Sequence, residues 1–137
     1  MSTPDERLKA FLERAPYIRF LGMRADLAGD EMTAVLPFSP HLVGNVMLPA
    51  LHGGVIGAFM EMTALAQLSL TQSSPRPPKT IDVTIDYLRP GRAVTSFARA
   101  EMRKVGRQVA SVHVEAWQEA RGKPIAALRG HFLMPQD

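Results

Sequence analysis

The stretch that decides the fold is LPALHGGVIGAFMEMTALAQLSL, residues 48–70. From Val55 to Leu70 nearly every side chain is apolar or small, and Glu61 alone carries a charge. A helix that is apolar on all sides must be covered on most of them, so this stretch predicts a buried central helix over residues 53–71. The carboxylate needs its own explanation, because desolvating an unpaired ionised group destabilises a fold strongly.

The segments before this helix predict shorter elements. Pro4 and Asp5 suit a first helical turn, and we expect an N-terminal helix within residues 1–15. Two extended pieces follow, at 17–28 and 31–36, joined by a turn at AGDE. Residues 37–51 hold three prolines and a glycine, which is typical of an ordered loop.

After the central helix the pattern changes to a period of two. The segment TIDVTIDYL places Ile81, Val83, Ile85 and Tyr87 on one face of a strand and the polar Asp82, Thr84 and Asp86 on the other. Three more extended segments follow at 93–105, 108–118 and 124–134. One domain over residues 1–137 is expected, of the α+β class, with a curved antiparallel sheet wrapped around the central helix.

Composition excludes several kinds of site. The chain has 137 residues and no cysteine, so disulfides, zinc–thiolate sites and a cysteine nucleophile are ruled out. We expect no metal site, since the spacing of His41, His113 and His131 matches none. The charged, amphipathic start MSTPDERLKAFLER is unlike a signal peptide, and the apolar run carries a glutamate. A cytoplasmic protein that spans no membrane and binds no nucleic acid is therefore expected.

The net charge of +3 is unevenly distributed. Residues 87–137 hold nine Lys or Arg against four Asp or Glu, whereas residues 1–86 hold seven against nine. A basic surplus in the second half favours an anionic ligand such as a phosphorylated cofactor. Scattered charge on strand surfaces explains the same count, and both interpretations stay open here.

Three ordinary explanations of Glu61 compete with a functional one: an ion pair with a partner such as Arg89, a solvated helix edge, or a subunit interface. The HGG segment before the helix favours function. First-turn amides have no partner within the helix, and the helix dipole favours negative charge beside them. Gly53 and Gly54 allow a ligand to approach these amides closely, and an oxyanion on an acyl carbonyl is one such ligand.

The distance between these two features predicts an assembly. Glu61 lies eight residues after Gly53, which corresponds to about 12 Å along a helix axis. One small carbonyl cannot readily contact both. If both act on the same carbonyl, the amide must come from one chain and the carboxylate from another, with the two helices antiparallel. This hypothesis requires a dimer with two sites at its interface.

Four segments then resemble, in the same order, the acyl-CoA thioesterases of the hotdog fold, of the phenylacetyl-CoA and 4-hydroxybenzoyl-CoA type. They are HGGVIGAFMEMTALA, TIDVTIDYLRPG, VGRQVASVHVEA and PIAALRGHF, and the resemblance covers residues 15 to 134. It implies a long helix wrapped by an antiparallel sheet, and a homodimer that often pairs into a tetramer. It also implies hydrolysis of an acyl-CoA thioester, with coenzyme A as part of the substrate and no separate cofactor.

The resemblance also implies roles for individual residues. Glu61 matches the catalytic acid of the family, and Gly53 matches the glycine whose amide polarises the thioester carbonyl. His52 matches the motif histidine, which holds the glycine turn. Thr80 matches a position at which some members place a water-orienting hydroxyl. The regions associated with coenzyme A binding contain Arg89, Gly106 and Arg107.

Two departures from the family pattern concern the placement of water. Asn45 stands seven rather than six residues before His52, and Pro49 replaces a common glycine. Leu65, one turn after Glu61, offers no hydroxyl where some members have threonine. The water-orienting role would then fall to Thr80 or to Asn45.

Three interpretations of the function remain open at the level of sequence, and the first of them, hydrolysis, has two possible mechanisms. Glu61 could act as a general base on water or attack the carbonyl to form an anhydride. A hydratase or dehydratase acting on an acyl thioester is a second possible enzyme, although such chemistry usually needs a histidine that works with a carboxylate. A non-catalytic acyl-CoA-binding protein is the third.

Overall fold

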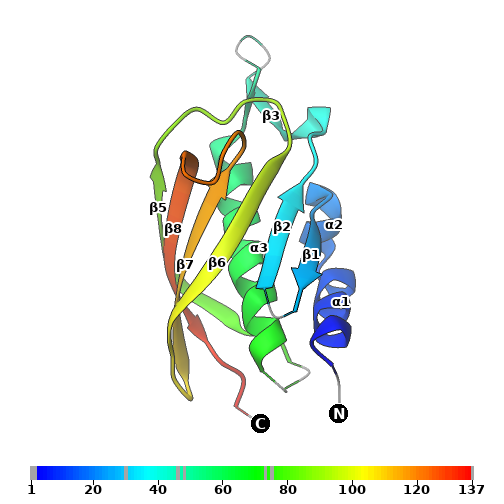
Figure 1. The fold of residues 1–137 in the computed structure, drawn as a ribbon, viewed down its shortest axis with the longest axis vertical. Coiled ribbons are helices and arrows are strands. Elements are labelled where there is room, and N and C mark those ends of the chain that lie inside the picture. Colours follow the sequence, from blue (N-terminus) through cyan, green and yellow to red (C-terminus); the bar gives the residue numbers. More distant parts are fainter. Residues whose placement is uncertain are drawn as a thin grey trace.

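The computed structural model describes residues 3–29, 31–45, 47, 49–72, 74 and 76–136. A six-stranded antiparallel sheet with the strand order β1-β2-β6-β7-β8-β5 curves around one long helix, α3 (Gly53–Thr71). Figure 1 shows this helix lying against the sheet, with two shorter helices beside it at the β1 edge. The predicted α+β class, a hotdog fold, is confirmed.

The central helix begins and ends at the residues predicted from the sequence. Most of its side chains are buried, and Phe59, Met60 and Leu68 are completely enclosed by the sheet and the N-terminal helix. By length and hydropathy alone α3 could cross a membrane, but 72% of that window is buried inside the fold. Its apolar character is therefore accounted for by the core that it forms.

The N-terminal segment differs from the prediction in one element. Helix α1 (Pro4–Arg14) is present as expected, but residues 16–21 form a second helix, α2 (Pro16–Leu21), instead of an extended piece. Proline at the first position presets the helical φ, and Ile18 and Leu21 bury one face. Gly22, at φ 77°, ends the helix in the left-handed conformation that favours glycine. Strands β1 (Arg24–Ala28) and β2 (Glu31–Leu36) then pair as a hairpin.

The proline-rich stretch before α3 contains more structure than the expected loop. A 3₁₀ turn, η1 (Pro40–Leu42), leads into a small two-stranded sheet of β3 (Val43–Asn45) and β4 (Ala50–Leu51). Figure 1 shows this hairpin extending beyond one end of the main sheet. The backbone N–H of Leu51 donates to the carbonyl of Gly91, which ties the start of α3 to the loop after β5.

Strand β5 (Lys79–Tyr87) forms an edge of the main sheet and contains a bulge at Ile81. Thr80 pairs with the fully buried Phe132, so its side chain faces the helix, whereas Asp82 pairs with the exposed His131 on the outer face. The alternation predicted from Ile81 to Tyr87 is therefore interrupted at the bulge, where the Ile81 side chain is 52% exposed. The extra residue of a bulge breaks the alternation of faces.

The last three strands agree closely with the sequence pattern. They are β6 (Ser96–Val105), β7 (Val109–Trp117) and β8 (Pro124–Leu133), and each pairs antiparallel with the next. Alternating residues of β7 bury Ala110, Val112, Val114 and Ala116 against α3. The opposite face carries charged side chains, among them the Arg129–Asp86 ion pair at 3.8 Å.

Candidate active site

The first turn of α3 leaves one amide available. The Nδ1 atom of His52 accepts a hydrogen bond from the Gly54 amide at 2.9 Å, and its carbonyl accepts from Val55 and Ile56. Among the described residues, no acceptor takes the N–H of Gly53. Three of the four amides of this turn are thus satisfied, and the fourth remains for a ligand at the positive end of the helix dipole.

Glu61 lies in the middle of the same helix and is half-buried. Its Oε2 atom accepts a hydrogen bond of 2.7 Å from the Thr80 hydroxyl, which the bulge in β5 turns toward the helix. Arg89 is not its partner, because the Arg89 guanidinium donates to the carbonyl of Pro124. No ion pair to Glu61 is found within the described part of the chain, so the hydroxyl orients this carboxylate without neutralising it.

Tyr87 also belongs to this site, although the alternating pattern of β5 places it only on one face of the strand. Its hydroxyl donates to the carbonyl of Gly53 at 2.7 Å, and its ring lies 3.6 Å from the position that a Cβ of Gly53 would occupy. A Cβ at Gly57 would lie 2.8 Å from Cδ1 of Ile85. Gly57 therefore lets Ile85 of β5 pack closely on α3, whereas a Cβ at Gly53 would make only an ordinary van der Waals contact with Tyr87.

One face of α3 is not fully covered by the rest of the chain. Gly54 is exposed, and Ala58, Glu61 and Met62 are half-buried. Ala58 follows Gly54 by four residues, and Glu61 and Met62 follow Ala58 by three and four residues, so these positions form one stripe along the helix. Because Gly53 and Glu61 are about 12 Å apart along the axis, one protomer does not bring them onto a single carbonyl.

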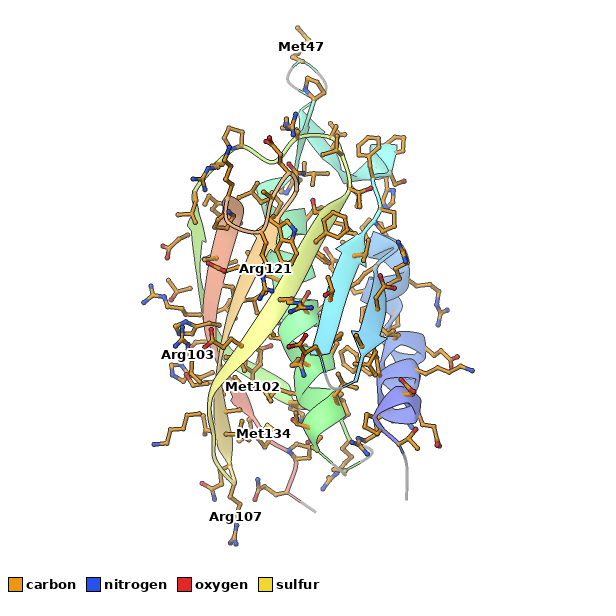
Figure 2. The ribbon with its side chains drawn as sticks, viewed as in Figure 1. Met47, Met102, Arg103, Arg107, Arg121 and Met134 are labelled. Atoms are coloured by element: carbon orange, nitrogen blue, oxygen red, sulfur yellow. The ribbon has the colours of Figure 1, made fainter. Side chains whose placement is uncertain are left out.

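The remaining predicted site residues lie in different places. The backbone of Asn45 forms the end of β3, and its side chain lies outside the described residues. Arg89 follows β5 and is exposed near the α3 N-terminus. Gly106 and Arg107 form the β6–β7 turn, and Figure 2 shows Arg107 at the end of the molecule opposite Met47 of the β3–β4 hairpin. Within one protomer, Arg89 and Arg107 are therefore separated by the length of a ten-residue strand, roughly 30 Å.

The comparisons with known proteins agree with one another. A family model described as the thioesterase superfamily matches residues 48–125, which is more than half of the chain. The medium/long-chain acyl-CoA thioesterase YigI of Escherichia coli (strain K12) is 33% identical, over 85% of this chain and 87% of that protein.

Solved structures show the same similarity. A crystal structure of a Chromobacterium violaceum protein is 41% identical, with a TM-score of 0.75, and the match covers 96% of this chain and 95% of that one. The E. coli PaaI protein from the phenylacetic acid degradation operon has a TM-score of 0.83 over 97% of this chain and 94% of its own, and at 20% identity it supports the fold alone. The helix, the sheet and these matches show that the chain belongs to the thioesterase superfamily.

Proposed function

We propose that this protein hydrolyses an acyl-CoA thioester to a free acid and coenzyme A. One feature of α3 carries the proposal. The helix presents the Gly53 amide at its positive end and the oriented carboxylate of Glu61 two turns later, and the described residues supply neither an acceptor for the amide nor a cation for the carboxylate. An amide at a helix N-terminus stabilises the oxyanion that forms on an acyl carbonyl. A carboxylate with no cationic partner is suited to act as a base or nucleophile.

The proposed site forms between two copies of the chain. If two α3 helices pack antiparallel along the uncovered stripe, Gly53 of one protomer lies opposite Glu61 of its partner, and the two-fold axis passes near Ala58. The unpaired edge of β5 supports this arrangement, because the strand exposes Ile81 (52%) and Tyr87 (54%). An open edge strand with exposed apolar side chains is typical of a surface that pairs with another chain.

Two routes of hydrolysis fit this geometry. In the first, Glu61 takes a proton from water, the hydroxide adds to the carbonyl carbon, and the C–S bond breaks to release the thiolate. In the second, a carboxylate oxygen of Glu61 attacks the carbonyl carbon, and the C–S bond breaks to release the coenzyme A thiolate and leave an anhydride. Water then opens the anhydride to give the free acid and the Glu61 carboxylate. In both routes the Gly53 amide of the other protomer holds the carbonyl oxygen as negative charge develops, and Thr80 fixes which oxygen of Glu61 faces the reaction.

The capping role of His52 favours hydrolysis over hydration of an enoyl thioester. Its Nδ1 atom is occupied by the Gly54 amide, so the ring proton resides on Nε2 and the imidazole serves to hold the turn. A hydratase would need this histidine to exchange protons with the substrate in concert with a carboxylate.

The relative named as a medium/long-chain acyl-CoA thioesterase favours an aliphatic acyl group in this protein too. The coenzyme A part is anionic, and Arg89 lies beside the α3 N-terminus where the thioester would sit. In an antiparallel dimer, the β6–β7 turn of one protomer lies at the same end as the α3 N-terminus of the other. The partner's Arg107 is therefore a candidate to bind the nucleotide of coenzyme A.

Replacing Glu61 tests the proposal directly. We expect Glu61→Gln to reduce release of free thiol from acyl-CoA at least a thousandfold, because the amide can neither accept a proton from water nor attack the carbonyl. The matched control is Glu115→Gln, on the outer face of β7, which removes the same charge away from the site. Full activity of Glu61→Gln, or equal losses in both variants, would show that Glu61 does not carry the chemistry.

A further inference from the structure

A cleft that is separate from Glu61 lies between α1 and the C-terminal end of α3. It encloses about 380 Å³, within the range of about 300–1,000 Å³ that is usual for small-molecule pockets. Its walls come from one side of α1, from the last turns of α3 and from the segment that leads to β5. The residues that define it here are Arg7, Ala10, Phe11, Ser69, Gln72 and Pro77.

The cleft and the proposed site lie on the same side of α3. One side of the helix carries Glu61 and, four, eight and eleven residues after it, Leu65, Ser69 and Gln72. Ser69 lies about 12 Å from Glu61 along the axis. Pro77 precedes Thr80, the hydrogen-bond partner of Glu61, by three residues. Helix α3 and the segment before β5 therefore both connect the Glu61 carboxylate to the cleft.

The interior of the cleft is mainly apolar although Glu6 and three arginines, Arg7, Arg14 and Arg76, line it. The Arg7 guanidinium donates to the Leu70 carbonyl at 2.6 Å, and the Arg76 guanidinium donates to the Gln136 carbonyl at 2.6 Å. Both charged ends therefore contact backbone oxygens, and the aliphatic stems remain to cover apolar surface. Phe11 and Ala10 supply the rest of the apolar wall.

We infer that this cleft binds the distal end of the substrate's acyl chain and so sets the chain length that the enzyme prefers. This inference rests on the proposed function, since it assumes that the thioester carbonyl lies at Glu61. A short acyl chain would end before the cleft, whereas a medium or long chain would run over Leu65 and bury its last methylenes there. Burial of each methylene is worth about 0.8 kcal/mol, or about fourfold in kcat/KM.

Filling the cleft gives a selective test. Ala10 is half-buried in the wall and lies on a regular helix, so Ala10→Phe should occupy the space without disturbing the reacting groups. We expect kcat/KM for dodecanoyl-CoA and palmitoyl-CoA to fall about 15- to 60-fold, equivalent to two or three methylenes left unburied. The value for butyryl-CoA should stay within twofold of the wild type.

The control is Lys9→Phe, which adds the same side chain at a neighbouring, exposed position of α1. Ala10→Leu repeats the test with a smaller addition if the phenylalanine variant fails to fold. An equal fall at all chain lengths, or no change at any, would overturn the inference while leaving the proposed function intact. A change in the oligomeric state of Ala10→Phe would assign the cleft to a subunit contact and overturn it too. A wild type that releases no thiol from any acyl-CoA would instead refute the proposed function, and the inference with it.

Discussion

The hydrogen bond from Thr80 to Glu61 gives the sharpest prediction about the mechanism. Thr80→Val keeps the shape of the side chain and its preference for a strand, but it removes the donor that lies 2.7 Å from Oε2. A hydrogen bond to a charged group contributes about 1.5–3 kcal/mol, equivalent to about 10- to 150-fold in rate if it is needed in the transition state. Because Glu61 is only half-buried, water can replace part of this interaction, and we expect kcat to fall about tenfold.

The assay should separate orientation of the carboxylate from general damage. Steady-state thiol release from one acyl-CoA gives kcat and KM, and thermal unfolding gives stability, which should change by less than about 1 kcal/mol because solvent reaches the carboxylate. Thr80→Ser retains the hydroxyl and should keep kcat within about threefold of the wild type. Unchanged kcat in Thr80→Val would refute the view that this hydroxyl sets the geometry of Glu61.

Two further predictions concern the subunit interface and the glycine turn. The chain has no native cysteine, so Ala58→Cys should form a disulfide-linked dimer under mild oxidation, seen on a non-reducing gel at twice the 15.1 kDa of one chain. The control, Glu115→Cys on the outer sheet face, should remain a monomer on the same gel. Crosslinking of both variants or of neither would argue against antiparallel α3 helices. Tyr87→Phe removes the donor to the Gly53 carbonyl and should lower kcat about two- to tenfold with KM unchanged. A raised KM with unchanged kcat would instead place Tyr87 in substrate binding.

Much of the fold followed from local patterns in the sequence. The apolar run after HGG predicted the central helix, and the alternation in the last fifty residues predicted β6, β7 and β8. The error at 17–28 has a local cause, since Pro16 and Gly22 are the start and stop signals of a one-and-a-half-turn helix. The six residues of this helix, Pro16–Leu21, are too few for helical periodicity to stand out from the strand that follows.

The candidate site was predicted in composition but not in its contacts. Sequence alone identified Glu61, Gly53, His52 and Thr80, whose assigned roles stay predictions. It named Arg89 as a possible ion-pair partner of Glu61 and Thr80 as a water-orienting residue. It could not identify the hydrogen bond from Thr80 to Glu61, because that contact depends on which way the start of β5 faces. The contact between Tyr87 and Gly53 was likewise hidden, since it joins residues that are 34 positions apart.

The bulge at Ile81 divides β5 into two parts with different tolerance of change. Beyond the bulge, the inward residues Val83 and Ile85 serve the hydrophobic core, and inserting or deleting one residue there would exchange the core face with the solvent face. Before the bulge, Thr80 follows its own alternation, which the core does not constrain. A substitution at Thr80 can therefore change the residue that contacts Glu61 without repacking the sheet, so the chemistry and the core can change independently.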